Sequence, residues 1–193
     1  QVTSFSVLLS REKASTLSNQ TITFTVPTAI NASETMILTY DNSTSIAAAL
    51  DFEDIALSDD GVELVLGSGA PTTGWQVVRT SATVLTFTNG STAVASGSVM
   101  VIKIGTNATS VVTGIEQITN GTAGSSTLAL SGTMGTVDIT GTAAMSIIAD
   151  DQVVITATVA PTITFTVGDN TTEFGTLSSS AATWADNVGG STT

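Results

Sequence analysis

Residues 21–26 read TITFTV, and this short stretch decides the fold class of the chain. Threonine alternates in it with isoleucine, phenylalanine and valine. Successive side chains of a β-strand point to opposite faces, so the alternation places apolar groups on one face and hydroxyls on the other. β-Branched and aromatic residues also favour strands. The stretch therefore predicts a half-buried β-strand.

Similar patterns continue along the chain, and Asp60-Gly61, Asn89-Gly90 and Asn120-Gly121 are turn signals between them. Short strands with such punctuation are typical of an all-β fold, and we predict an antiparallel β-sandwich, Ig-like or jelly-roll-like. Residues 46–54 also have a helical interpretation, and residues 105–126 are predicted to form a long surface excursion. Further strands are predicted at 36–40, 56–57, 62–66, 75–79, 83–88, 99–104, 127–130, 144–148, 153–159 and 163–167.

The N-terminal stretch QVTSFSVLLS, residues 1–10, is predicted to form a further apolar strand. Phe5, Val7 and Leu9 alternate with other residues, and the charged run at residues 11–13 follows. An apolar strand before a flexible charged connector suits a donor strand, which protrudes and completes the sheet of a neighbouring copy. Repetition of that contact gives a head-to-tail homopolymer. The alternative is an ordinary first strand that pairs within its own sandwich.

Three segments are predicted: a donor strand and linker at 1–13, a sandwich at 14–160, and a C-terminal strand and tail at 161–193. The hexapeptide TITFTV recurs at residues 162–167. It marks either the start of a second sandwich or a chance likeness between Thr/Val-rich strands.

Composition excludes several functions. The net charge is −12 with only four lysines and arginines, so no basic surface for nucleic acid can form. Histidine and cysteine are absent, which removes the commonest general base, the best metal ligands and any disulfide. We predict no enzyme, no cofactor and no membrane insertion. The Ser/Thr-rich surface favours an extracellular location, and Gln1 is interpreted as the residue after a cleaved signal peptide, or as the boundary of a fragment.

Seven of the eight asparagines lie in the N-x-Ser/Thr acceptor pattern of N-glycosylation. The functional interpretation is a sugar-coated surface. The alternative is that these are favourable turn sequences. The candidates are Asn19, Asn31, Asn42, Asn89, Asn107, Asn120 and Asn170.

Acidic residues cluster between positions 51 and 63. Asp51, Asp54, Asp59 and Asp60 are weak candidates for Ca²⁺, whose ligands are oxygens. Their spacing is not that of an EF-hand, and solvated strand ends explain most of the cluster.

Several phrases together carry a resemblance: TITFTVPTAINAS, LDFEDIALSDDGVEL, MVIKIGTNAT, IADDQVVITATVAPTITFTV and FGTLSSSAATWA. With them the chain resembles Ser/Thr-rich secreted surface proteins of uncultivated prokaryotes. In architecture it is similar to β-sandwich pilins and matrix-fibre subunits that polymerise by donor-strand exchange, including archaeal bundling pili. The resemblance implies an extracellular filament without a catalytic site.

The sequence therefore predicts a structural subunit of an extracellular filament or pilus. It would polymerise by inserting its N-terminal strand into the next subunit. The alternative is a sandwich module of a larger cell-surface adhesin or S-layer-like protein.

Overall fold

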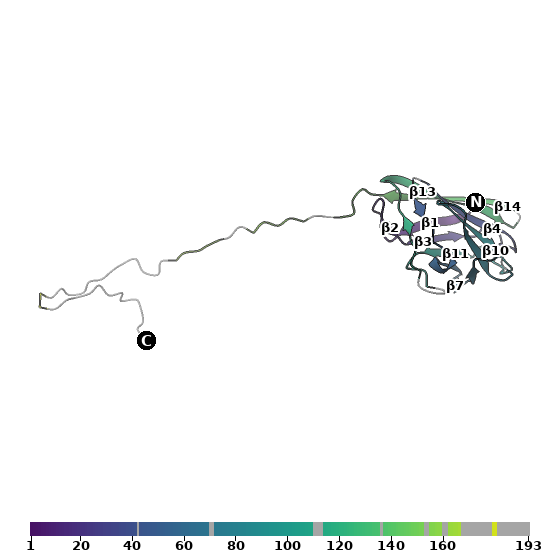
Figure 1. Cartoon of the computed structure of the whole chain (residues 1–193), viewed down its shortest axis with the longest axis horizontal. Coiled ribbons are helices and arrows are strands. Elements are labelled where there is room, and N and C mark those ends of the chain that lie inside the picture. The colour runs from purple at the N-terminus through teal and green to yellow at the C-terminus, as the bar shows by residue number, and fades with distance from the viewer. Residues whose placement is uncertain are drawn as a thin grey trace. The chain divides into compact units, whose positions relative to one another are not determined.

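The structure, a computed structural model, is an all-β fold in which two main sheets enclose one hydrophobic core (Figure 1). It describes residues 1–41, 43–69, 72–109, 114–135, 137–152, 155–159, 162–166 and 179–180. The predicted all-β sandwich is confirmed. The elements are β1 (Thr3–Leu9), β2 (Leu17–Ser18), β3 (Gln20–Thr25), β4 (Thr35–Tyr40), β5 (Ser45–Ile46), the 3₁₀ turn η1 (Phe52–Asp54), β6 (Ile55–Asp59), β7 (Val62–Glu63), β8 (Leu66–Gly67), β9 (Trp75–Arg79), β10 (Val84–Asn89), β11 (Val99–Ile104), β12 (Ile118–Thr119), β13 (Gly124–Met134) and β14 (Val137–Ile147).

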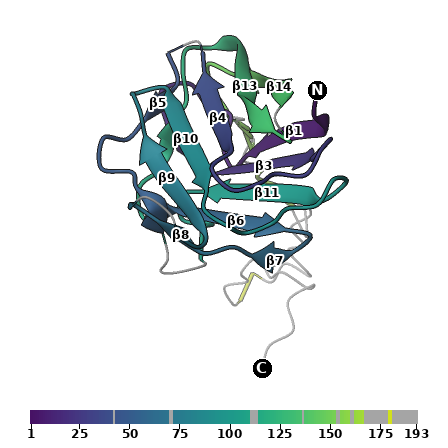
Figure 2. The same ribbon diagram turned by 90° about the vertical axis from the view of Figure 1, so that its right-hand side faces the viewer.

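The first sheet has the strand order β1-β3-β11-β6-β7, and the second has the order β14-β13-β4-β10-β9-β8 (Figure 2). A small third sheet, β2-β12-β5, lies apart from both ladders. Neighbouring strands are antiparallel except for β8 and β9, which pair in parallel. Strands β1 and β14 therefore lie at the ends of the two main sheets.

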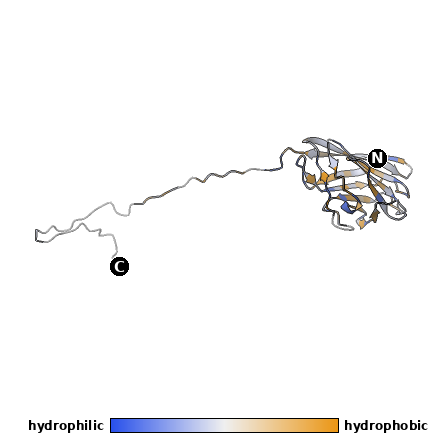
Figure 3. Cartoon of the chain, viewed as in Figure 1, coloured by the Kyte–Doolittle hydropathy of each residue, from blue (hydrophilic) through white to orange (hydrophobic). Residues whose placement is uncertain are grey.

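The deciding hexapeptide lies mainly in β3, an interior strand of the first sheet between β1 and β11. Ile22 and Phe24 of β3 are fully buried, whereas Thr21 and Thr23 are only half-buried, as the alternation predicted. The opposing sheet contributes a matching buried set that includes Phe87. Hydrophobic residues accordingly concentrate on the strands (Figure 3). The core is thus built from one face of each strand, as burial of apolar area requires.

Three local predictions have different outcomes. Asp60-Gly61 is a two-residue hairpin turn with φ of 48° and 81°, and it joins Asp59 to its partner Val62. Residues 46–54 form no α-helix and contain the end of β5 and the 3₁₀ turn η1. The predicted surface excursion at 105–126 is wrong in part, because it contains β12 with the fully buried Ile118.

The chain divides into two compact units, Gln1–Val153 and Val154–Thr193. Residues 1–13 share a unit with the rest of the sandwich, so the structure does not divide the chain at residue 13. In the second unit, residues 155–159 and 162–166 carry no regular secondary structure. Their large apolar side chains are almost fully exposed, with Ile163 at 91%. Among these described residues, the strands predicted at 153–159 and 163–167 are not formed.

Candidate functional site

Strand β1, the predicted donor strand, pairs within its own sandwich. It forms an antiparallel ladder with β3 at the edge of the first sheet. Phe5, Val7 and Leu9 are half-buried and pack against the core. The ring of Phe5 meets Phe24 edge-to-face, with centroids 6.2 Å apart. In the single chain this segment is therefore an ordinary first strand, which was the alternative interpretation.

The start of β1 also contacts the second sheet. A bulge after Thr3 interrupts the ladder with β3, and Ser4 has a φ of 52°. The preceding Val2 N–H donates a hydrogen bond to the carbonyl of Thr140 on β14 at 3.1 Å. Gly141 permits this approach, because a Cβ there would lie 2.4 Å from Cγ2 of Val2. We call this line of contact between β1 and β14 the seam.

The charged run after β1 is fastened to the end of β14. Ala14 N–H donates to the carbonyl of Ile148 at 2.8 Å, and Ile148 N–H donates to the carbonyl of Glu12 at 3.0 Å. We call residues 11–14 with residues 148–151 the clasp. A segment held by two backbone hydrogen bonds differs from the flexible connector that was predicted.

Three ion pairs strengthen the clasp, and in the longest of them Lys13 Nζ lies 3.9 Å from Oδ1 of Asp151. Arg11 Nε lies 2.7 Å from Oδ2 of Asp151, and Lys13 Nζ lies 3.2 Å from Oδ1 of Asp150. The hydrogen bonds from Arg11 and Lys13 lower the pKa of Asp151 and of Asp150 respectively, and the positive charges add to the effect. The bond to Asp151 in turn raises the pKa of Arg11. Both carboxylates therefore remain ionised further into acid than a free aspartate.

Asn120 holds the same run from the protein interior. It is only 2% exposed, and its Nδ2 donates to the carbonyls of Arg11 at 2.7 Å and Lys13 at 3.0 Å. Its backbone N–H donates to the carbonyl of Thr16 at 2.9 Å. Asn120-Gly121 is thus no exposed hairpin turn, since the asparagine is a buried two-hydrogen donor to main-chain oxygens.

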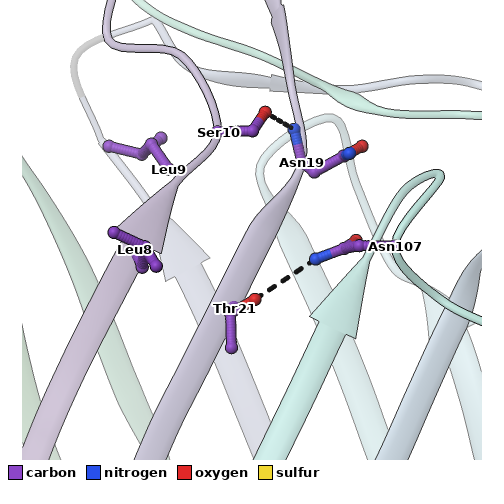
Figure 4. Close-up of a pocket in the computed structure, with 6 residues that line it drawn as sticks. All are labelled: Leu8, Leu9, Ser10, Asn19, Thr21 and Asn107. Atoms are coloured by element: carbon purple, nitrogen blue, oxygen red, sulfur yellow. Dashed lines mark hydrogen bonds between the residues drawn. The ribbon is translucent and has the colours of Figure 1, made fainter.

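A shallow hollow of about 120 Å³ opens beside the end of β1 (Figure 4). Within it, Asn107 Nδ2 donates to Oγ1 of Thr21 at 3.2 Å, and the backbone N–H of Asn19 donates to Oγ of Ser10 at 2.8 Å. No lining residue is aromatic or titratable, so the hollow offers neither a general base nor a stacking platform for sugar. The lining residues are Leu8, Leu9, Ser10, Asn19, Thr21 and Asn107.

Three of the predicted glycosylation sites are used structurally. Asn89, Asn107 and Asn120 each commit both hydrogens of the side-chain amide to hydrogen bonds within the fold. Asn89, for example, donates to the carbonyls of Asn31 at 2.9 Å and Thr92 at 2.8 Å. An N-linked sugar replaces one of these hydrogens, so the folded sandwich favours the turn-and-loop interpretation at the three positions.

The other candidate acceptors differ in their surroundings. Asn31 is exposed in the loop between β3 and β4. Asn19 is half-buried and donates one amide hydrogen to Oγ1 of Thr106 at 2.7 Å. Asn42 and Asn170 lie outside the described residues. Asn31 is therefore the acceptor most open to modification among those described.

Asp54, one of the four weak calcium candidates, has a structural role. It is buried, and its Oδ1 accepts hydrogen bonds from the backbone N–H groups of Ile115 at 2.8 Å and Glu116 at 2.9 Å. Its Oδ2 accepts from the backbone N–H of Asp51 at 3.1 Å. The carboxylate thus ties the turn η1 to the segment before β12 through three backbone hydrogen bonds.

The remaining acidic candidates are also explained locally. The Asp51 side chain caps η1 by accepting from the backbone N–H of Glu53 at 2.8 Å. Asp60 Oδ1 accepts from the N–H of Val99 at 2.8 Å. Asp59 ends β6, and its buried Oδ1 has no hydrogen-bond partner among the described residues. Within the described ranges, no group of three or more Asp or Glu side chains is arranged to hold a metal ion.

The sequence did not predict a buried polar pair, Tyr40 with Gln20, or a polar cluster around Asp41. Tyr40 donates its hydroxyl hydrogen to Oε1 of Gln20 at 2.6 Å, and burial raises the pKa of this tyrosine. Burial acts to raise the pKa of Asp41, but hydrogen bonds from Thr127 and Ser126 lower it overall. Such contacts join residues 20 to 86 positions apart, so no local pattern could have indicated them.

Comparisons with known proteins add little to this geometry. The sequence matches no family model and no curated protein. A similar solved structure is ACE19, the collagen-binding subdomain of the Enterococcus faecalis surface protein ACE, at 6% identity and a TM-score of 0.41, over 74% of this chain and 95% of that one. Another is a family 123 glycoside hydrolase from Clostridium perfringens, at 11% identity and a TM-score of 0.26, over 70% of this chain but 22% of the enzyme.

These likenesses are too distant to assign a function, and the fold is established by the strand pairing itself. In the described part of the chain, no helix is long and apolar enough to cross a membrane.

Proposed function

We propose that this chain is a structural β-sandwich module of a larger cell-surface protein. The observation that carries the proposal is the state of β1. The backbone of β1 pairs with β3, Phe5 packs against Phe24, and the clasp fixes the residues that follow, all within the same sandwich. A sandwich that already holds its first strand has no vacant position for a neighbour's strand.

The segment after the sandwich supports a modular arrangement. Residues 155–159 and 162–166 have the alternation of strands, yet Ile155 and Phe165 are each 86% exposed. Apolar strand-like sequence is stable in water only when another sheet covers it. The hexapeptide that begins at residue 162 is identical to the one in β3, so further β-structure built on this segment is the simplest cover. Sandwiches would then follow one another along the chain.

The role we propose is structural and not catalytic. The hollow in Figure 4 has no titratable lining residue, and a second hollow of about 280 Å³ is lined by Ser125, Ala144, Met145 and Ser146. The carboxylates of Asp54 and Asp41 are engaged in hydrogen bonds that hold loops. A Ser/Thr-rich surface with few charges suits an extracellular setting.

A strand-exchange filament is the second candidate. Donation of β1 would require the ladder with β3 and the clasp to open in every subunit. The free energy lost by this opening would be regained when the same contacts form between subunits. The two candidates therefore differ in one measurable respect, namely whether β1 pairs with β3 of its own chain or of a neighbour.

A disulfide across the ladder separates them. Leu8 lies opposite Thr21 in the β1–β3 register, and Leu8 is exposed. Directly opposed residues of antiparallel strands lie within disulfide range. The chain has no native cysteine, so Leu8→Cys with Thr21→Cys creates a single pair.

The double variant would be produced in its native host, extracted from the cell surface and run without reductant. A module gives a fast-migrating monomer with an internal crosslink. A strand-exchange filament gives a ladder of covalent multimers, and that result would overturn the proposal. The Leu8→Cys single variant is the matched control, because it has no partner thiol on β3.

A further inference from the structure

We infer that the seam and the clasp form a mechanical lock that lets the sandwich bear tension between its two ends. This inference rests on the proposed function, since load reaches the sandwich in this way when the chain is held on both sides.

The two strands run in parallel beside each other. Val2 lies next to Thr140 at the start of the seam, and Lys13 forms a parallel bridge with Ile148 at its end. The chain therefore enters the sandwich at one end of the seam and leaves it at the other. Tension pulls β1 back toward its N-terminus and pulls β14 toward its C-terminus. The strands can separate only by sliding along each other.

Sliding loads all the links of the seam and the clasp together. They comprise the Val2–Thr140 hydrogen bond, the two backbone hydrogen bonds of Ile148, and the bonds from Asn120 to the clasp. The antiparallel ladder of β1 with β3 lies along the same direction. When links break together, the barrier to unfolding under force is the sum of their contributions. When a strand is peeled sideways, they break one after another and each faces the load alone.

The placement of charge points the same way. Arg11 and Lys13 are two of only four basic residues in the chain, and both lie in the clasp. Exposed ion pairs add little to equilibrium stability, commonly less than about 1 kcal/mol. At the exit from the sandwich, however, they must rupture before β14 can move. Their concentration at this point therefore fits resistance to force better than it fits equilibrium stability.

Single-molecule force spectroscopy on the full chain tests the inference. Handles attached through Gln1→Cys and Gln152→Cys pull the seam in shear. Handles at Gln1→Cys and Val137→Cys pull two positions at the same end of the seam, and so unzip it. Both geometries use exposed positions of the same folded protein. We expect the shear geometry to unfold at a force about twofold higher at equal loading rate, because forced unfolding follows the unfolding barrier.

The variant pair Arg11→Ala with Lys13→Ala should lower the rupture force in shear and leave the unzipping force unchanged. Asp150→Asn with Asp151→Asn removes the same ion pairs from the other side and should behave alike. Equal forces in the two geometries, or an unchanged shear force in both variant pairs, would overturn the inference. The crosslinking result on β1 is independent of these forces, so failure of the proposed module and failure of the lock are distinguishable.

Discussion

Replacing Asn120 by aspartate changes almost no volume and reverses the chemistry of a buried contact. The amide nitrogen of Asn120 lies 2.7 and 3.0 Å from the carbonyl oxygens of Arg11 and Lys13. In Asn120→Asp an oxygen takes its place, and an ionised carboxylate would face two carbonyl oxygens in an interior position. The folded variant must therefore bind a proton, and the pKa of residue 120 is raised by burial and by these acceptors.

The loss in free energy of unfolding follows mainly from the cost of binding this proton. An aspartate with an ordinary pKa near 3.9 costs about 4 kcal/mol to protonate at about pH 7. The neutral carboxyl donates one hydrogen bond where the amide donated two, which costs about 1 kcal/mol more. We expect a loss of about 5 kcal/mol at about pH 7 and about 2 kcal/mol at about pH 4.5, where protonation is nearly free. Domains of this kind are commonly stable by about 5–15 kcal/mol, so the loss at neutral pH is severe.

Urea unfolding followed by tryptophan fluorescence measures this difference, since Trp75 is buried in the core. Gln1→Glu is the control, because it makes the same change from amide to carboxylate at an exposed position, and it should change stability by less than about 0.5 kcal/mol. A free energy of unfolding for Asn120→Asp within about 1 kcal/mol of the native value at neutral pH would contradict the proposed role of the Asn120 amide. A loss of stability that does not become smaller in acid would contradict it as well.

Four further outcomes are expected. Gly141→Ala should cost about 1–3 kcal/mol in urea unfolding because its Cβ meets Val2, and Val2→Ala in the same chain should restore part of that; no restoration would remove the close approach as the cause. Asp54→Asn should cost about 2–3 kcal/mol by weakening three backbone hydrogen bonds, and added Ca²⁺ should leave the Tm of both proteins unchanged; a rise in the native Tm would instead indicate a metal site. The lowered pKa values of Asp150 and Asp151 mean that the ion pairs stabilise the fold above about pH 4 and lose this effect as the pH falls through the lowered values. The difference in urea midpoint between the native protein and Asp150→Asn with Asp151→Asn should therefore shrink from about pH 5 to about pH 2, and a constant difference would contradict it. In a glycosylating host, glycopeptide mass spectrometry should find sugar at Asn31 and none at Asn89, Asn107 or Asn120; sugar at any of those three would contradict the burial argument.

The strands with strict alternation were the most predictable part of the fold. The predicted bounds of β9 and β11 agree with the structure, because period-two patterns depend only on neighbouring residues. The hairpin of β13 and β14 was predicted at less than half its length. Its unpredicted ends are rich in Ser, Thr and Gly, and these residues dilute the apolar signal of the few buried side chains there, such as Met134 and Ile139.

The candidate site was less predictable, for a physical reason. The charges at residues 11–13 were recognised, but their partners at 150 and 151 lie 137 to 140 positions away. Contacts of that separation depend on how the whole sandwich closes. The two Asn-Gly dipeptides lie at the junctions between strands, as predicted, but the burial of Asn89 and Asn120 was not predictable, since the same two residues suit an exposed turn or a buried donor to a loop. Only the tertiary environment distinguishes them.

Because the hexapeptide is repeated, correct folding depends on which copy becomes available for pairing first. Residues 162–167 and 21–26 are the same sequence, so either copy could pair between β1 and β11. Synthesis from the N-terminus presents the copy in β3 first, and domains generally fold in that order as they emerge. A chain released all at once from denaturant lacks this precedence. Refolding of residues 1–193 should therefore give more misfolded product than vectorial synthesis does, with the wrong hexapeptide trapped between β1 and β11.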